Sequence, residues 1–358
     1  MKHHEREFFI ARILSGHVSL GEYQLSGYTD WSIRLKAEEL YREVLEEGLL
    51  SGLYSMEDIQ ALLTKPFGVS NYRFGITLWA PDDDVKLSVL KEDTEKLKVG
   101  IYESQLNLGQ KEAARVGLRK AEAEISRLLT IKHSLDGMTA QGLATMHKQI
   151  FLIGSSIVNG QGARLLGGDW YKNTYTPLLS VALKRFSESV LDEAEYRELA
   201  RNDPWRSIWS ARKSDGLFGR NASELSEEQR TLVLWSQFYD NVYENPECPP
   251  DSVIDDNDAL DGWTIVQRRK REKENLVSSI EDKLSDKAKK ANEIFIPAED
   301  DKAAAKIDSI NSIEARIIKR QRLNQVRQQG HVNEIDFKDV QQSLKEKMQA
   351  MKEEKERG

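Results

Sequence analysis

The chain has 358 residues, of which 39% are hydrophobic and 31% are charged, and its formal net charge is −7. This length allows a sizeable core and two or three domains. The negative net charge argues against a protein whose whole surface binds nucleic acid, although a local basic patch stays compatible with it. Cys248 is the only cysteine, which excludes an internal disulfide and a multi-cysteine zinc site. We therefore expect a protein of the reducing cytosol.

Membrane association is not expected from the apolar segments. The N-terminal sequence MKHHEREFFIARILSG is charged and lacks the continuous apolar core of a signal peptide. The longest apolar run, at about 150–158, is interrupted by glycine and serine and is too short to span a bilayer. These features predict a soluble chain that makes no contact with a membrane.

Residues 1–80 are predicted to form an N-terminal helical module with a small hairpin. A helix over about 5–14 should end before Gly16, and the sequence HVSLGEYQLSGY, which alternates loosely and holds two glycines, is typical of a hairpin. A longer amphipathic helix is expected over about 31–50. Ser55 can cap the short helix that follows it.

Residues 81–136 are predicted to form a helical hairpin with its break near Gly109. Pro81 and three aspartates mark the start of the first helix, because acidic side chains favour the positive end of the helix dipole. The second helix, over about 110–132, carries an apolar stripe at spacings of four and three: Ala114, Leu118, Ala121, Ile125 and Leu128. Packing within one bundle and a short coiled-coil arm that meets another chain both fit this stripe.

Residues 137–265 are predicted to form an aromatic-rich helical body. Asp203 and Pro204 indicate a helix start, and Ser226 with Gln229 matches a capping box. The expected helices cover about 139–149, 177–190, 192–200, 203–213 and 226–244.

Residues 266–358 are predicted to form a charged helical C-terminal arm, entered by a helix that starts near 258 and runs to about 290. Two further helices carry apolar stripes that can pair with each other, with the body or with another chain. The stripes comprise Ala303, Ile307, Ile310, Ile313 and Ile317, then Phe337, Val340, Leu344, Met348 and Met351. The predicted fold class is therefore mainly α: a multi-helix body with a small hairpin, a helical-hairpin insertion and an extended helical arm.

Three segments resemble functional motifs but do not satisfy them. The glycine-rich segment GQGARLLGG (160–168) lacks the lysine and hydroxyl of a phosphate-binding loop, so a flexible turn is favoured. The segment DSVIDDNDALDG (251–262) has the wrong ligand spacing for calcium, which favours a solvated acidic loop that caps the next helix. The basic run RRKREK (268–273) is diluted by glutamate, which favours a solvated helical face.

No catalytic, cofactor-binding or metal-binding residue is assigned. The six histidines are scattered, without a metal-binding or nucleophile-activating pattern, and Cys248 lies beside Glu247, whose charge disfavours a thiolate. Pairs of aspartate and glutamate can catalyse reactions without leaving a sequence signature. An enzyme with an unmarked carboxylate site therefore stays a third candidate.

The aromatic segment from Asp203 to Trp263 contains four of the seven tryptophans. Aromatic side chains dominate both cores and interfaces, so the segment is either the densest part of the core or a docking surface. The candidate partner-binding residues are Trp205, Trp209, Trp235, Tyr239, Tyr243 and Trp263, with the neighbouring basic residues Arg268, Arg269, Lys270 and Arg271.

Several segments together resemble uncharacterised proteins of large contractile-tailed bacteriophages that are encoded among tail or virion assembly genes. The resemblance rests on EREFFIARILSGHVSL, KAEELYREVLEEGLL, IKHSLDGMTAQGLA, DPWRSIWSARK, LSEEQRTLVLWSQFYDNVYENPECPPDSVIDDNDALDGW and QRRKRE. It implies a non-enzymatic role as a chaperone-like or minor structural protein, with other phage structural or assembly proteins, or a second copy, as partners. It also implies a location in the host cytoplasm or the virion.

The second candidate function is a nucleic-acid-associated role in packaging or transcription. It would use RRKREK and the basic segment IIKRQRLNQVRQQ, since clustered lysine and arginine neutralise phosphates. Steeply salt-dependent binding would distinguish it from protein–protein assembly.

Overall fold

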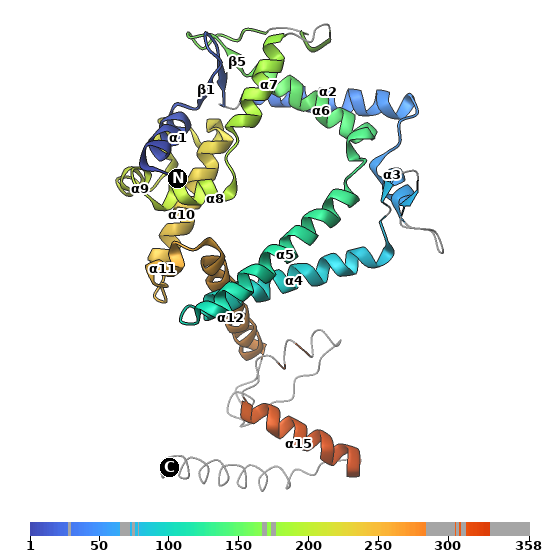
Figure 1. The fold of residues 1–358 in the computed structure, drawn as a ribbon, viewed down its shortest axis with the longest axis vertical. Helices are drawn as coiled ribbons and strands as arrows, with labels where there is room; N and C mark the ends of the chain where they lie inside the picture. The colour runs from blue at the N-terminus through green and yellow to red at the C-terminus, as the bar shows by residue number, and fades with distance from the viewer. Residues whose placement is uncertain are drawn as a thin grey trace. The chain divides into compact units, whose positions relative to one another are not determined.

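The computed structural model describes residues 1–27, 30–64, 72–73, 76–77, 79–166, 170–172, 177–283, 305, 308 and 313–329. The chain divides into two compact units, Met1–Ile265 and Val266–Gly358, which are described separately. The described part is mostly helical, with short strands near the N-terminal hairpin, so the predicted mainly α class is confirmed (Figure 1). The predicted sections 1–80, 81–136 and 137–265 all lie in the first unit.

The chain starts with a helix and the expected hairpin. Helix α1 (His3–Ser15) ends at Gly16, whose φ of 67° is left-handed and whose N–H donates to the carbonyls of Arg12 and Ile13. Strands β1 (His17–Ser19) and β2 (Gln24–Ser26) pair antiparallel. A third strand, β5 (Ile157–Val158), pairs with β2 from a distant part of the chain, which local patterns did not indicate.

Two antiparallel helices form the next layer. Helix α2 (Trp31–Leu50) begins after Asp30, whose side chain accepts from the backbone N–H of Ser32, and it packs along α6 (Ala140–Ser155). Helix α6 runs past the predicted end near 149, because its last turns bury Phe151 against α2. Helix α3 (Met56–Leu63) starts after the predicted cap Ser55, which forms a capping box with Asp58.

The helical hairpin consists of α4 (Pro81–Glu103) and α5 (Leu108–Lys132). Its break lies at 104–107, before the predicted Gly109, because the Asn107 side chain accepts from the Gln110 N–H and starts α5 earlier. Leu118 is buried in the main core, and Leu128 packs beside α3. The stripe on α5 therefore packs within this chain, as expected if it serves one helical bundle and not a contact with another chain.

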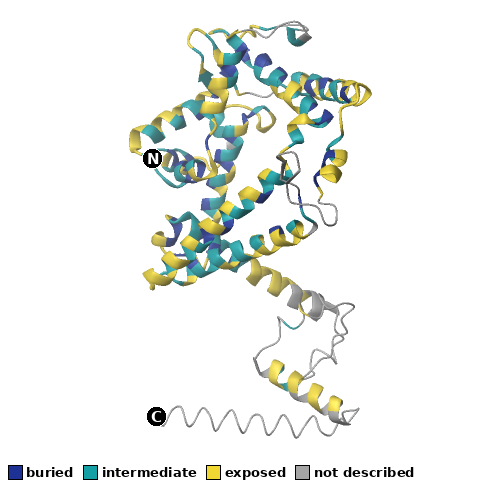
Figure 2. Cartoon of the chain, turned by 45° about the vertical axis from the view of Figure 1, so that its right-hand side comes forward, coloured by how far each residue is buried: buried dark blue, intermediate teal, exposed yellow. Residues whose placement is uncertain are grey.

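The aromatic-rich body surrounds a core of buried tryptophan, tyrosine and aliphatic side chains. Figure 2 marks the buried positions of the chain in dark blue. Helix α9 is shorter than predicted, and Pro204 occupies its cap position, whereas the Asp203 carboxylate accepts from the Ser207 N–H at 3.2 Å. The helices of residues 177–265 are α7 (Pro177–Ser189), α8 (Glu193–Arg201), α9 (Trp205–Ser210), α10 (Glu227–Tyr243), α11 (Asp251–Ile254) and the first turns of α12 (Asn257–Lys283).

Short elements complete the described part. They are the strands β3 (Tyr72–Arg73) and β4 (Ile76–Thr77) and the 3₁₀ turns η1 (Asp136–Met138), η2 (Trp170–Lys172), η3 (Asp215–Phe218) and η4 (Ala222–Glu224). The described start of the glycine-rich segment is a turn: the Asn159 side chain accepts from the N–H groups of Gln161 and Ala163, and Gly162 has a φ of 79°.

The second unit contains the remainder of α12 and α15 (Ile313–Gln329). Within the first predicted stripe, only the Ile317 side chain is described, and it is 40% exposed. The second stripe, from Phe337 to Met351, lies outside the described residues.

Gly262 allows α12 to approach α4 at a distance that no other residue tolerates. A Cβ atom at this position would lie 2.1 Å from the carbonyl oxygen of Lys98 and 2.9 Å from the Cβ of Tyr102. Because the nearest atom belongs to the backbone of another helix, relief requires the two helices to separate.

We therefore expect Gly262→Ala to lower the free energy of unfolding by about 3 kcal/mol, the upper part of the range for overpacking. Gly100→Ala, within α4, is the matched control, because a Cβ there meets no atom within 4 Å. It should raise stability by about 0.5–1 kcal/mol through helix propensity. Urea denaturation followed by circular dichroism measures both changes, and equal effects would contradict the close approach.

Candidate functional site: a charged cleft at the start of α12

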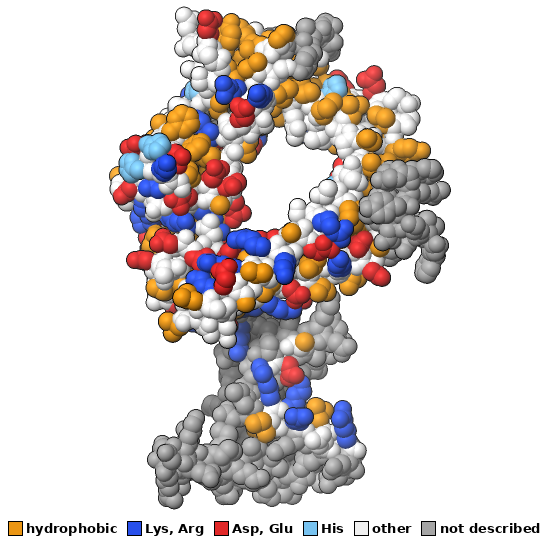
Figure 3. Space-filling view, viewed as in Figure 1, with side chains coloured by type: hydrophobic (Ala, Val, Ile, Leu, Met, Phe, Trp, Pro, Cys, Tyr) orange, Lys and Arg blue, Asp and Glu red, His pale blue; other side chains and the backbone are white. Residues whose placement is uncertain are grey.

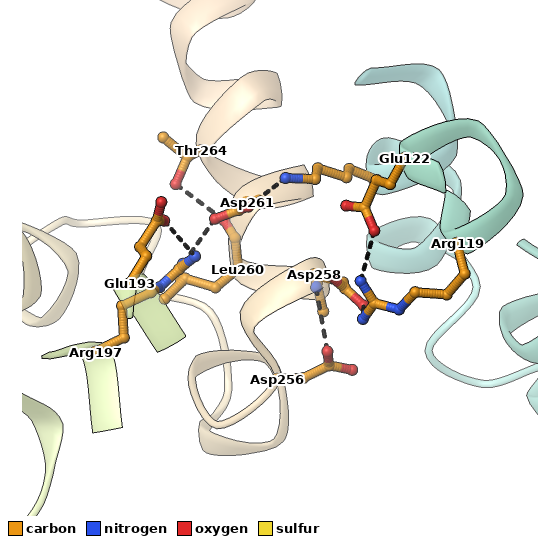
Figure 4. A network of polar contacts seen from close by, with 11 residues as sticks. Arg119, Glu122, Glu193, Arg197, Asp256, Asp258, Leu260, Asp261 and Thr264 are labelled. Carbon is orange, nitrogen blue, oxygen red and sulfur yellow. Dashed lines mark hydrogen bonds and ion pairs between the residues drawn. The ribbon is translucent and has the colours of Figure 1, made fainter. Parts of the chain in front are cut away.

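A cleft of about 650 Å³ lies among α4, α5, α8 and the beginning of α12, and charged side chains dominate its lining (Figure 4). Four cationic and six acidic side chains contribute to it. The charged lining residues are Lys98, Arg115, Arg119, Arg197, Glu122, Glu193, Asp255, Asp256, Asp258 and Asp261.

Arg197 is the buried centre of one side of the cleft. It lies on α8, which is capped by Asp192, and its side chain is 3% exposed. Its guanidinium donates to Asp261 at 2.6 Å and lies over the Trp235 ring, 4.9 Å from the ring centroid. A buried guanidinium requires a counter-charge, so Asp261 is a structural requirement of this core.

Asp261 joins two helices to α12. One carboxylate oxygen accepts from Arg197, and the other accepts from Lys98 of α4 at 2.6 Å. Glu193, one turn before Arg197 on α8, pairs with the same guanidinium at 3.5 Å but is largely exposed. Asp261 therefore connects α4, α8 and α12 through charge-assisted hydrogen bonds.

Asp256 and Asp258 form ion pairs with basic side chains on successive turns of α5. Lys111, Arg115 and Arg119 follow one another at intervals of four residues and so project from one face of the helix. Asp256 contacts Lys111 at 3.0 Å and also pairs with Arg115, whereas Asp258 accepts from Arg119 at 2.8 Å.

These two aspartates have pKa values shifted in opposite directions. Burial raises the pKa of Asp256, but the hydrogen bond from Lys111 and the charge of Arg115 outweigh burial and lower the pKa overall. Burial also raises the pKa of Asp258, and the charge of Arg119 compensates only in part, so this pKa stays raised.

The ion pairs of the cleft join four helices: α4, α5, α8 and α12. Asp256, Asp258 and Asp261 each form an ion pair with a lysine or arginine. Across the described residues, no group of three or more histidine, cysteine, aspartate or glutamate side chains has a geometry that could hold a metal ion. The cleft is a charged surface lined by residues of packed helices.

The structure places most of the predicted partner-binding aromatic residues in the core. Trp205, Trp209 and Tyr239 are fully buried, and Trp263 is 4% exposed. The indole N–H of Trp205 donates to Ser236 at 2.7 Å, and that of Trp209 donates to Asp240 at 2.7 Å. The docking-surface interpretation does not hold for these four side chains, because their rings are buried inside the fold.

The other predicted residues lie nearer the surface. Trp235 is partly buried beneath Arg197, and Tyr243 is 41% exposed beneath the guanidinium of Arg206. The basic residues Arg268, Arg269, Lys270 and Arg271 are exposed on α12, as expected for a solvated helical face.

The acidic segment 251–262 is not a solvated loop, because three of its aspartates are paired in the cleft. Its neighbouring aspartate, Asp255, is exposed. The sequence contained a signal for this arrangement: the spacing of Lys111, Arg115 and Arg119 makes a basic stripe that needs an acidic partner. Local sequence patterns do not indicate that this stripe pairs with a segment some 140 residues away.

Comparisons with protein-family models, with curated proteins and with solved structures found no match to this chain. None of the helices in the described part combines the length and hydrophobicity needed to cross a bilayer.

We expect Asp261→Asn to lower the free energy of unfolding by about 3 kcal/mol, because it removes the charge that compensates buried Arg197. The control is Asp93→Asn, which removes an exposed ion pair with Lys96 and should change stability little. Urea denaturation at neutral pH measures both variants. A loss no greater than that of the control would show that Arg197 does not depend on Asp261.

The opposite pKa shifts predict opposite pH behaviour for Asp256→Asn and Asp258→Asn. A lowered pKa means that Asp256 stabilises the fold above about pH 4, its unfolded pKa, and that this contribution is lost as pH falls through the folded value. A raised pKa means that Asp258 favours the fold when protonated, and this contribution is lost as pH rises through its folded value.

At pH 7, Asp256→Asn should therefore lower the free energy of unfolding, whereas Asp258→Asn should leave it unchanged or raise it. At pH 3 the difference between the two variants should shrink. Urea denaturation at both pH values tests this, and a difference that is the same at pH 3 and pH 7 would contradict the assigned shifts.

Proposed function

We propose that this chain is a non-enzymatic assembly protein of a large contractile-tailed bacteriophage, chaperone-like or a minor structural component, that acts through protein–protein contacts. On this proposal, its partners are other phage structural or assembly proteins, and it works in the host cytoplasm or in the virion. The support comes from the sequence resemblance together with an exposed apolar surface on the first unit.

That surface, the α2–α3 patch, consists of Leu49, Leu50, Leu53, Tyr54 and Met138. Leu50 is 89% exposed and Met138 is 73% exposed. The backbone N–H of Ala140, two residues after Met138, donates to the carbonyl of Tyr54 at 3.0 Å, which brings the segment of Met138 beside that of Tyr54. Figure 3 shows hydrophobic side chains gathered in this region, where α2 ends.

The α2–α3 patch is the observation that carries the proposal. Contiguous exposed apolar side chains on a folded surface characterise interaction sites, since burying one leucine contributes about 1.5–3 kcal/mol. The patch is also held in place: α2 and α6 pack along each other, and Gly48 lies against Ala140. A preorganised patch loses less conformational entropy on binding than a mobile segment does.

The charged cleft supports the same proposal in a different way. Its ion pairs fix α4, α5, α8 and α12 relative to one another, and its aspartates are engaged by cations. Such a frame can present surfaces to partners without using a cofactor, as the proposal requires.

The test is co-purification from infected cells with the tagged full chain, at moderate salt and with nuclease added. We expect tail or other virion proteins to be recovered in stoichiometric amounts and identified by mass spectrometry. The variant Leu50→Ser/Tyr54→Ser/Met138→Ser should lower their recovery at least about tenfold, which corresponds to about 1.4 kcal/mol of binding free energy.

The matched control is Val89→Ser/Val181→Ser/Leu234→Ser, which alters three exposed apolar side chains outside the patch. It should retain the partners. A bait that returns alone, or a patch variant that recovers the same proteins as the wild type, would contradict the proposal.

A further inference from the structure

Helix α15 differs in charge from the chain as a whole. Its sequence, IEARIIKRQRLNQVRQQ, contains five lysine and arginine residues and one glutamate, whereas the complete chain has a net charge of −7. A 17-residue helix with this excess of positive charge attracts polyanions.

The positive charge is exposed on one face. Arg316, Arg320 and Arg327 are all exposed, and their spacing of four and seven residues places them within about 40° around the helix axis, given 3.6 residues per turn. Leu323 and Asn324 are exposed beside them. Lysine and arginine side chains follow α15 along its length in Figure 3.

Two other basic groups are less suited to this role. Lys319 is exposed on the same side of α15 but pairs with Asp308 at 2.6 Å. On α12, Arg268 contacts Glu272 at 3.9 Å, and the run that it begins is interrupted by acidic residues. The three arginines define what we call the α15 basic face.

We propose that the α15 basic face, formed by Arg316, Arg320 and Arg327, binds double-stranded nucleic acid. The helix is about 25 Å long at 1.5 Å per residue, and a single helix of this kind fits the major groove of a duplex. This activity goes beyond the assembly role, because it requires no contact through the α2–α3 patch.

The composition of α15 favours a duplex over an acidic protein or a single strand. Arginine hydrogen-bonds to guanine edges in the major groove, and Asn324, exposed beside the three arginines, is of the side chain type that hydrogen-bonds to adenine edges. Its sequence has no aromatic residue, so it lacks the stacking platforms that proteins use to bind single strands.

The three arginines also set the expected salt dependence. Each phosphate neutralised on a duplex contributes a slope of about −0.9 to the logarithmic dependence of affinity on salt. Three contacts give a slope of about −2.7, which is a fall in affinity of about 40-fold between 50 and 200 mM salt.

The experiment measures fluorescence anisotropy of a labelled 20-base-pair duplex of mixed sequence with the full chain, from 50 to 300 mM sodium chloride. The wild type should bind with a slope near −2.7 or steeper. Arg316→Glu/Arg320→Glu/Arg327→Glu should lower affinity at least about tenfold at 100 mM salt. Arg316→Gln/Arg320→Gln/Arg327→Gln should also lower it, without introducing negative charge.

The matched control is Arg42→Glu/Lys91→Glu/Lys120→Glu, which makes the same charge change at exposed positions of the first unit. It should keep affinity within about threefold of the wild type, and circular dichroism checks that every variant remains helical. The proposal is overturned if the wild type does not bind at 50 mM salt or if the control loses as much affinity as the α15 variants. It is also overturned if polyglutamate of equal charge displaces the duplex equally well, which would assign the face to an acidic protein.

Discussion

The burial of one positive charge, on Arg197, constrains much of the first unit. A guanidinium that is 3% exposed and lies against aromatic rings is unfavourable without a counter-charge, and Asp261 supplies it. Asp261 can reach both Arg197 and Lys98 only if α12 lies against α4, and this approach depends on Gly262, the next residue. Packing and charge are therefore coupled: the glycine brings the carboxylate into place, and the carboxylate makes the buried arginine tolerable.

Cations of α5 also compensate the burial of two carboxylates, Asp256 and Asp258, but to different extents. Asp256 meets two cations, and its pKa is lowered, whereas Asp258 meets Arg119, which is itself 63% exposed and also pairs with Glu122. One largely exposed cation compensates the burial of a carboxylate less than two cations do, of which Lys111 is 14% and Arg115 is 36% exposed. The cleft thus holds two aspartates, two positions apart, whose pKa values are shifted in opposite directions: the carboxylate of Asp256 is favoured and that of Asp258 is disfavoured.

Local chemistry made many element boundaries predictable, and long-range contacts account for the rest. Gly16 ended α1, and Ser226 began α10 through its capping box, because both signals act within a few residues. The pairing of β5 with β2 and the extra turns of α6 depend on contacts between distant segments. The aromatic segment shows the limit for the site: its composition fitted core and interface equally well, and only burial placed Trp205 and Trp209 inside. For the ion pairs of the cleft, the sequence showed the basic stripe on α5 but did not show which acidic residues pair with it.

The distribution of charge along the chain bears on how two kinds of partner could coexist. Residues 1–265 contain 30 lysine and arginine residues against 41 acidic ones, whereas residues 266–358 contain 22 against 18. A polyanion is therefore repelled by the first unit and attracted to basic segments of the second. The α2–α3 patch is apolar, and its contacts respond weakly to salt, while those of the α15 basic face respond strongly. Binding of a protein partner and of a duplex would thus differ in chemistry and in the residues that carry it.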